Sequence, residues 1–376
     1  MPGFEIINDK EYLAVKKLFK KEGGVLFAHG FDKIRKKYHV REFEYNFKKK
    51  MNCKHALAVS SGTAAIKIAL KALGVKKGDE VITQAFNFIA TVEAILDIGA
   101  KPIIINVNKT LNMNPSEIEK VINKKTKVIL PVHMLGVPAE MDSIIKIAKK
   151  YKLKVLEDNC EALGCRYNKK YLVGDVGVAS LDYGKVITCG EGGLIYTNDK
   201  KIDKYSREYH DHGHENNPIK PRGKDTRTIF GFNYRLTEIQ AAIGKEQLNK
   251  LDFILKSNKL RYNAVNNVLS SIVSTRTIPK KTNIIYDTFI FYVKNSKLRS
   301  DTINLLNNEG IGTKNLPDAI EWHCASYWDH ALSKNQIKKV LETKLLLEES
   351  IAIPIWLNKS VNDYKQISKK IAKLHK

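Results

Sequence analysis

The stretch Ser180 to Gly193 reads SLDYGKVITCGEGG and places Lys185 between a serine and a glycine-rich turn. The apolar run 194–197 that follows is typical of a strand. In a chain this rich in lysine, Lys185 is most simply a solvated surface residue and Gly-Glu-Gly-Gly a tight turn. The alternative is a nucleophilic amine that forms a Schiff base, because a desolvated or cationic pocket lowers the pKa of a lysine. Residues elsewhere in the chain decide between these interpretations.

The composition predicts a globular protein with a sizeable core. The chain has 376 residues, enough for one large domain and a smaller one, and 43% of them are hydrophobic. No segment approaches the ~20 apolar residues of a membrane span. The first residues lack the basic and apolar regions of a signal peptide. We therefore expect a cytoplasmic protein with no membrane partner.

The formal net charge of +24 raises the question of a nucleic-acid partner. The lysines are spread over many segments, and no basic stripe interleaved with aromatic residues occurs. We therefore predict a lysine-rich surface that attracts anionic substrates through its summed field, and no nucleic-acid partner.

The cysteine and histidine pattern does not favour a metal site. The five cysteines form no CxxC pair, and we expect reduced, mostly buried thiols. His210, His212 and His214 alternate within a loop rich in glycine and asparagine, but no matching distant ligand is evident. We expect no bound metal.

Strands alternate with helices through the first 160 residues, which predicts a largely parallel sheet with helices on both faces. Ligands bind such sheets beyond the carboxyl ends of the strands. Asp158 and His133 both follow strand ends, although a helix N-cap and a satisfied buried histidine are ordinary alternatives. The predicted strands are 54–59, 78–83, 102–107, 127–132 and 154–158, and the predicted helices between them are 89–98, 116–122 and 141–150.

The segment Ser60 to Leu70 reads SSGTAAIKIAL, a small polar turn followed by an alanine-rich helix. Backbone N–H groups at a helix N-terminus bind anions, and Gly62 would let a phosphate approach the backbone. An ordinary N-cap explains the same residues equally well.

The chain divides, in this interpretation, into a large domain over residues 1–250 and a small α/β domain over 251–376. A long helix opens after the segment 231–238 and is expected to end near Leu251. Beyond it the alternation loosens, with a strand at 287–293 and another at 351–355.

Several segments together resemble the fold-type I, pyridoxal-phosphate-dependent sugar aminotransferases of the DegT/DnrJ/EryC1 family. They follow the order and spacing of that family from residue 40 to 245, and the C-terminal third resembles it only in general layout. The matching segments are 61–65, 78–82, 86–88, 157–164, 174–177, 185–193 and 232–238.

The resemblance implies a cofactor site for pyridoxal phosphate (PLP). Lys185 would carry the cofactor as a Schiff base, and Asp158 would pair with its ring nitrogen. Glu161 stands where many members have a glutamine that donates to the phenolic oxygen, which an ionised glutamate cannot do. The other implied cofactor contacts are Phe88 on the ring, Ser61, Gly62, Thr63 and Ser180 at the phosphate, and Asn233 from a second subunit.

Substrate contacts are also implied. Arg235 is the foremost candidate for a substrate carboxylate, because arginine binds carboxylates bidentately. The further candidates are Arg222, His133, His212 and His323.

The implied activity is transfer of an amino group from glutamate to a keto or aldehydo sugar by a homodimer with shared active sites. Details such as Val132-His133-Met134 and Asp211-His212-Gly213-His214 resemble the members that aminate 8-oxo-3-deoxy-octulosonate for lipopolysaccharide. One alternative acceptor is a nucleotide-linked 4-keto hexose. An alternative of another class is a PLP-binding regulator without turnover.

Overall fold

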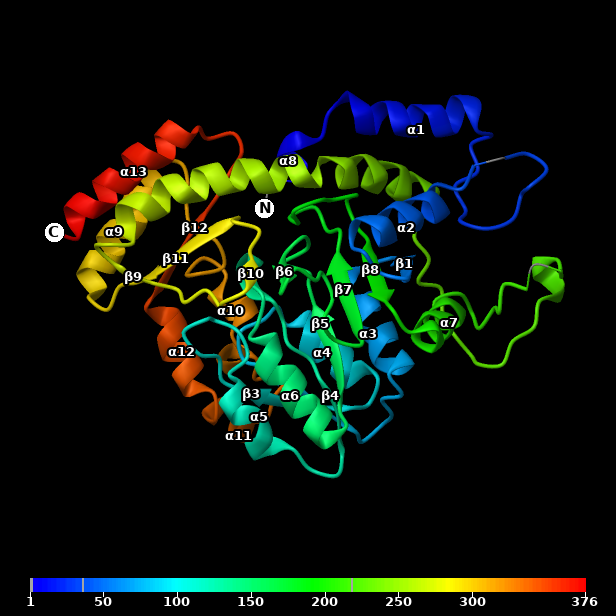
Figure 1. The fold of residues 1–376 in the computed structure, drawn as a ribbon, viewed down its shortest axis with the longest axis horizontal. Helices are drawn as coiled ribbons and strands as arrows, with labels where there is room; N and C mark the ends of the chain where they lie inside the picture. The colour runs from blue at the N-terminus through cyan, green and yellow to red at the C-terminus, as the bar shows by residue number, and fades with distance from the viewer. Residues whose placement is uncertain (1–2, 36, 218) are drawn as a thin grey trace.

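The computed structural model describes residues 3–35, 37–217 and 219–376 and has a large β-sheet at its centre (Figure 1). Strand β8 runs antiparallel to both of its neighbours, and the remaining pairs of the sheet are parallel. The predicted mainly parallel sheet is thus confirmed. In spatial order the strands are β1 (His55–Val59), β8 (Gly193–Thr197), β7 (Val176–Ser180), β5 (Lys154–Asp158), β4 (Thr126–Ile129), β2 (Glu80–Gln84) and β3 (Lys101–Ile105).

Helices cover both faces of this sheet because side chains alternate along each strand. In β1, Leu57 belongs to the core shared with α3, α4 and α7, whereas Ala56 and Ala58 belong to the core shared with α2 and α8. A further core joins α5 and α6 to strands β2, β4 and β5. These helices are α2 (His39–Lys50), α3 (Gly62–Ala72), α4 (Ala90–Asp97), α5 (Pro115–Val121), α6 (Met141–Tyr151), α7 (Lys200–Tyr209) and α8 (Glu238–Leu269).

Helix α8 is longer than the sequence predicted, because it continues past Leu251 to Leu269. Thr237 begins it with a capping box, and buried residues such as Ile254 and Val265 continue its packed face where the prediction ended. It contacts α1 (Asp9–Lys21) and α2 as well as α13 (Val361–Leu374), and in Figure 1 it spans both parts of the molecule. The predicted domain boundary between residues 250 and 251 therefore lies inside a helix, not in a linker.

The C-terminal part has its own core, built on a small antiparallel sheet. Its strands are β9 (Ser274–Thr275), β11 (Thr288–Tyr292) and β12 (Ser350–Pro354), and a separate short pair is formed by β6 (Arg166–Tyr167) and β10 (Thr282–Asn283). Its further helices are α9 (Ser296–Asn308), α10 (Ile320–His323), α11 (Lys334–Lys338) and α12 (Leu341–Glu348). Short 3₁₀ turns occupy Phe4–Ile6, Met134–Gly136, Arg222–Lys224 and Ala325–Tyr327.

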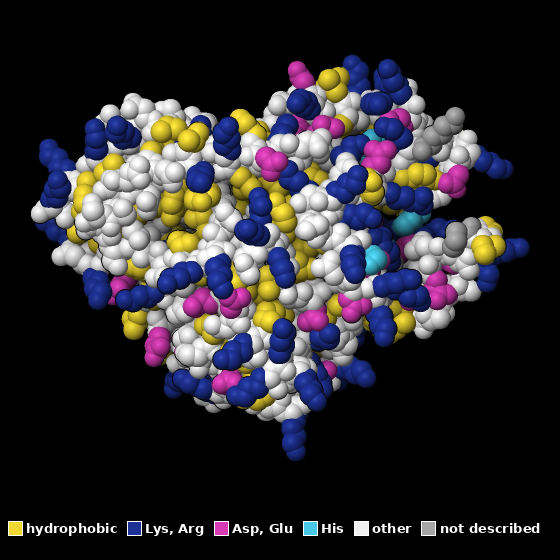
Figure 2. Space-filling model, viewed as in Figure 1, with side chains coloured by type: hydrophobic (Ala, Val, Ile, Leu, Met, Phe, Trp, Pro, Cys, Tyr) yellow, Lys and Arg dark blue, Asp and Glu magenta, His cyan; other side chains and the backbone are white. Residues whose placement is uncertain are grey.

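The molecular surface carries lysine and arginine side chains scattered among acidic ones over the face drawn in Figure 2. Within the described ranges, none of the helices is long and apolar enough to cross a membrane. In the same part of the chain, no group of three or more His, Cys, Asp and Glu side chains is placed to hold a metal ion.

The topology brings the ends of three strands together. Strands β1, β7 and β5 run in the same direction, so Val59, Ser180 and Asp158 end at one edge of the sheet. Strand β8 begins at that edge with Gly193, directly opposite Ser180. This edge is where the rule for parallel sheets places a ligand.

Candidate active site

A cavity of about 530 Å³ opens at this edge of the sheet. It collects most of the cofactor residues that the sequence predicted, together with one predicted substrate contact. The predicted residues that line it are Ser61, Gly62, Thr63, Phe88, Asp158, Glu161, Ser180, Lys185 and His323.

Lys185 is half-buried and lies in the turn that follows β7. Asp182 shapes this turn: its carbonyl accepts from the Lys185 N–H at 3.0 Å, and its carboxylate accepts from the Gly184 N–H at 2.9 Å. Burial alone would lower the pKa of Lys185, but nearby negative charge, that of Glu161 above all, outweighs burial and raises it. This direction is the opposite of the lowering that the Schiff-base hypothesis assumed, and its cause is the carboxylates beside the amine.

Asp158 is buried at the end of β5, and its carboxylate has a fixed orientation. One oxygen accepts from the Thr91 hydroxyl at 3.1 Å, and the other accepts from the Cys160 N–H at 2.9 Å. Thr91, from helix α4, was not predicted as a site residue. Two such donors stabilise an ionised carboxylate and keep a further lone pair free for a cationic N–H.

The N-terminus of α3 forms another wall of the cavity. Ser61 caps the helix, its hydroxyl accepting from the Ala64 N–H at 3.1 Å. Gly62 packs so closely against the end of β7 that a Cβ atom there would lie 2.9 Å from the Ser180 Cβ. Thr63 is exposed. The sequence left open whether this segment is an N-cap or an anion site. The Ser61 hydroxyl caps the helix, and the first N–H groups of the helix border the cavity, where they could bind an anion.

Glu161 is ionised in this cavity. Its oxygens accept from the Leu135 N–H at 3.1 Å and from the Asn315 side-chain amide at 3.2 Å. Burial alone would raise the pKa of Glu161, but the nearby Lys185, His323 and Lys314 lower it to about 2. A carboxylate in this state accepts hydrogen bonds and cannot donate one.

The C-terminal part supplies the groups opposite Glu161. His323 donates from Nδ1 to the Ala319 carbonyl at 2.8 Å, and its Nε2 lies 3.7 Å from a Glu161 oxygen. Burial lowers the pKa of His323 in spite of that carboxylate. Lys314 lines the same cavity and is held by Asp287 at 2.8 Å.

His133 lies outside the cavity. It is buried, its Nδ1 accepts from the Ala139 N–H at 2.9 Å, and its Nε2 therefore carries the proton and donates to Glu157 at 3.0 Å. Both ring nitrogens are used by the protein itself. This geometry corresponds to the alternative of a satisfied buried histidine and not to a substrate contact.

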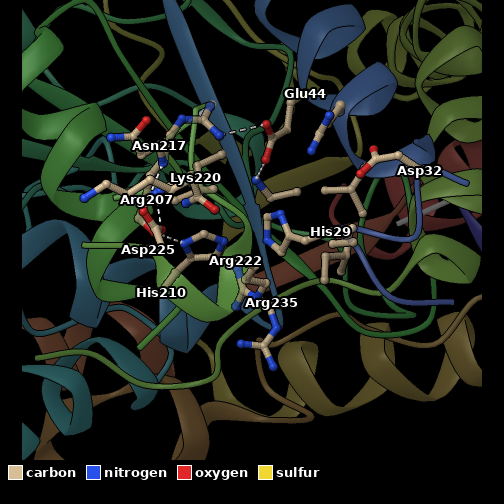
Figure 3. A pocket seen from close by; sticks show the side chains of 18 of the residues that line it. His29, Asp32, Glu44, Arg207, His210, Asn217, Lys220, Arg222, Asp225 and Arg235 are labelled. Carbon is tan, nitrogen blue, oxygen red and sulfur yellow. Dashed lines mark hydrogen bonds and ion pairs between the residues drawn. The ribbon is translucent and has the colours of Figure 1, made fainter. Parts of the chain in front are cut away.

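Arg222 and Arg235 line a second cavity of about 540 Å³, which we call the basic cavity (Figure 3). Both guanidinium groups grip the fully buried Asp211, Arg222 through both of its terminal nitrogens and Arg235 at 2.6 Å. In Figure 2 a hollow at the right edge, bordered by Lys, Arg and His side chains, lies between the loops that follow α1 and α7. The two predicted arginines therefore do not line the cavity that contains Lys185, which we call the cofactor cavity.

The carboxylates around the basic cavity are already occupied by donors of the protein. Glu44 accepts from Arg207 at 3.0 Å and from a backbone N–H, and Asp225 accepts from several N–H groups of its own loop. Asp32, which is exposed, accepts from the Tyr38 hydroxyl through one of its oxygens. Arg41 and Lys220 also line the cavity and are exposed. The basic cavity thus offers cationic donors to a ligand, and this is the chemistry that an anionic group requires.

His212 and Asn233, the remaining predicted contacts, are exposed and line neither cavity. His212 has a left-handed backbone with φ of 54°. Asn233 forms an isolated bridge with Asp211 and accepts from the Arg235 N–H through its side chain.

The cofactor cavity fits PLP by its donor set. A lysine amine, a buried carboxylate with a free lone pair, and a helix N-terminus beside Ser180 lie around one space. Phe88 is 45% exposed and lines the cavity, and its ring, which stacks on Trp322, can lie against a planar ring there. Gly62 leaves no room for a side chain against Ser180, so the N-terminus of α3, which can bind a phosphate, lies directly beside the end of β7.

The sequence model of the DegT/DnrJ/EryC1/StrS aminotransferase family matches residues 28–372. The chain belongs to this family. A solved aminotransferase from Psychrobacter cryohalolentis superposes with a TM-score of 0.85 at 26% identity, covering 98% of both chains. NtdA from Bacillus subtilis, solved with the cofactor PMP bound, gives a TM-score of 0.81 at 25% identity over 99% of this chain and 84% of its own. The fold is that of the fold-type I PLP-dependent aminotransferases.

Curated relatives cover less of the chain. GDP-perosamine synthase of Escherichia coli O157:H7 is 40% identical over 226 residues, which are 59% of this chain and 61% of that protein. A pleiotropic regulatory protein of Geobacillus stearothermophilus is 34% identical over 281 residues, 73% of each chain. The match to the synthase thus spans about three fifths of its length.

Proposed function

We propose that this member of the family is a PLP-dependent aminotransferase that moves an amino group from glutamate to a nucleotide-linked 4-keto hexose. The observation that carries the proposal is the placement of Lys185, Asp158 and the open N-terminus of α3 around one cavity at the edge of the sheet. Bound PLP would supply an electron sink for the substrate carbon.

Different residues of the chain would carry out proton transfer, pairing with the ring nitrogen and phosphate binding. Lys185 Nζ would bond the cofactor and, once displaced by the amino donor, move the proton to and from the substrate carbon. Asp158, oriented by Thr91 and Cys160, would hold the proton on the ring nitrogen. Thr63, Ser180 and the N–H groups of α3 would bind the phosphate.

Glu161 would act as an acceptor and not as a donor. Its low pKa keeps it ionised beside Lys185 and His323. In that state it would hold the protonated amine of Lys185, or the amine of a donor, by an ion pair. The glutamine found at this position in many members would make a different contact.

The acceptor proposed here is the alternative of the sequence analysis and not its first choice. The name of the E. coli relative refers to a GDP-linked amino sugar, which favours a nucleotide-linked acceptor over octulosonate. The cationic donors of the basic cavity suit a diphosphate. Because Arg222, Arg235 and Asn233 do not line their own chain's cofactor cavity, we propose a homodimer in which these residues serve the site of the partner subunit.

The name of the Geobacillus relative supports a second candidate, a PLP-binding regulator without turnover. Release of 2-oxoglutarate from glutamate by the purified protein separates the two. We expect release, and a protein that binds PLP but produces no 2-oxoglutarate with any keto sugar would favour the regulator. Parallel assays with a GDP-linked 4-keto hexose and with 8-oxo-3-deoxy-octulosonate identify the acceptor.

Mixed dimers test the shared site. Lys185→Ala and Asn233→Ala should each be inactive alone. A site that takes Lys185 from one subunit and Asn233 from the other is intact once in each mixed dimer, so random mixing should restore about a quarter of the wild-type activity. If both residues served the same subunit's site, mixing would restore nothing.

A further inference from the structure

The N-terminal residues Gly3, Phe4 and Glu5 reach the turn that carries Lys185. The Gly3 N–H donates to the Lys185 carbonyl at 3.2 Å, and the Phe4 ring stacks on Tyr183 with centroids 5.1 Å apart and planes at 19°. We propose that residues 3–5 form a clasp that positions Lys185 for its chemistry. The chemical role of Lys185 rests on the proposed function, whereas the contacts of the clasp do not.

Residue 3 has to be glycine for this contact. A Cβ atom at Gly3 would lie 2.6 Å from the Lys185 carbonyl oxygen and 3.0 Å from the Ile187 Cα. Both are backbone atoms, which cannot swing aside as the end of a long side chain can. The Gly3 φ of −55° is open to any residue. The requirement is therefore one of space, and a side chain would push the clasp away from the lysine.

The clasp is also fixed to the C-terminal part of the chain. The Glu5 carboxylate accepts from the backbone N–H groups of Leu357 and Asn358, both at 3.1 Å. The Phe4 ring meets the edge of Trp356 at 6.1 Å. Phe4 and Trp356 both line the cofactor cavity, so this contact closes one of its sides.

A third anchor lies on α8. Lys250 donates from Nζ to the Ile6 carbonyl at 2.6 Å and to the Glu11 carboxylate of α1 at 2.5 Å. The clasp is thus held on α8 and on the segment after β12 while it contacts Lys185. Because a lysine side chain has four flexible torsions, the backbone position of residue 185 decides where its amine reaches. Gly3 and Glu5 are positioning residues in this sense, since they act through Lys185.

The first test compares Gly3→Ala with Lys10→Ala, which changes an exposed side chain of the same N-terminal segment that lines neither cavity. In PLP-loaded protein we expect Gly3→Ala to lower kcat about tenfold with KM for glutamate changed less than twofold. The pH midpoint of the visible absorbance of the bound cofactor should shift by about half a unit or more, whereas Lys10→Ala should match wild type. Equal midpoints in both variants would overturn the proposal.

Glu5 provides a second route if Gly3→Ala fails to fold. Glu5→Ala should shift the absorbance midpoint in the same direction, and Glu5→Gln, which keeps an acceptor oxygen, should restore most of the wild-type value. Hydrogen–deuterium exchange of the peptide 182–187 is measured on protein without PLP. Its exchange rate should rise severalfold in Glu5→Ala. If wild type binds no PLP, the proposed function fails while the exchange still tests the clasp. Unchanged exchange together with an unchanged midpoint would refute the clasp alone.

Discussion

The ionisation state of Glu161 can be tested directly with Glu161→Gln. The side chain is 5% exposed and titrates at about 2, against 4.5 for an ordinary glutamate. Its surroundings therefore favour the carboxylate over the acid by about 3 kcal/mol, at 1.36 kcal/mol per pH unit. The substitution keeps the size of the side chain and removes the charge and the titration, and it replaces one of the two acceptor oxygens by an NH2 donor.

The sign of the effect follows from the lowered pKa. A carboxylate whose pKa is lower in the folded state contributes stability that is complete above its unfolded pKa and is lost as the pH falls toward 2. At pH 3.5 the unfolded chain is mostly protonated at this residue and the folded chain is not. Between pH 7 and pH 3.5 wild type should lose about 1 kcal/mol from this residue alone, and Glu161→Gln should lose none of it.

Urea unfolding of both proteins at several pH values between 7 and 3.5 measures this difference. Glu191→Gln is the matched control, because Glu191 lines the same cavity with its side chain exposed. Its free energy of unfolding should change with pH in parallel with that of wild type. Parallel curves for wild type and Glu161→Gln would refute an ionised Glu161. The same variant removes the largest of the charges that raise the pKa of Lys185, so that pKa should fall.

The other predictions concern the remaining charged groups of the two cavities. Lys185→Ala should abolish borohydride fixation of PLP and lower turnover about 100- to 10,000-fold, the usual contribution of a proton-transferring group. Asp158→Asn should still bind PLP but lower turnover about 10- to 1,000-fold, since a neighbouring opposite charge moves a pKa by about 1–3 units. Asp211→Asn leaves Arg222 and Arg235 without their buried carboxylate, at a cost of about 3–5 kcal/mol. For a chain of this length that corresponds to a melting temperature lower by about 5 °C in differential scanning calorimetry.

The central sheet follows from sequence periodicity, whereas the site residues needed the family resemblance as well. Asp158 was singled out because it ends a strand, and the strand occupies Lys154–Asp158 as expected. Local patterns left ordinary alternatives open for Asp158, Lys185 and Gly62, and the resemblance supplied their cofactor roles and that of Ser180. All four line the cavity, because the topology of a parallel sheet brings its strand ends together.

The strand-end rule fails for His133 because it predicts the sheet edge at which a residue lies but not the direction in which its side chain points. The His133 N–H pairs with the Asp158 carbonyl, so the two residues are backbone neighbours. The chain then turns into the 3₁₀ segment Met134–Gly136, and the imidazole lies between Glu157 and the Ala139 N–H. No feature of the local sequence indicates which side of the sheet edge the ring occupies.

Lys314 and Asn315 were missed for a different reason. Asn315 meets Glu161 across 154 positions of sequence, and Lys314 reaches the cavity from the small C-terminal part. Neither lies in a periodic segment or a motif. Contacts between distant loops depend on how the two cores pack against α8, which local propensity does not determine.

The segment from Asp211 to Arg235 contains predicted site residues that do not line the cofactor cavity of the same chain. The Ser60 N–H donates to the Tyr234 carbonyl at 2.8 Å, so this segment runs beside the strand that leads into α3. Yet Asn233 points to solvent, and Arg235 turns to Asp211 in the basic cavity. The resemblance implies that Asn233 contacts the cofactor of a second subunit and that Arg235 contacts the substrate. The proposed dimer with shared sites agrees with the exposure of Asn233, whereas Arg235 would have to reach the site of a second copy while it is paired with Asp211.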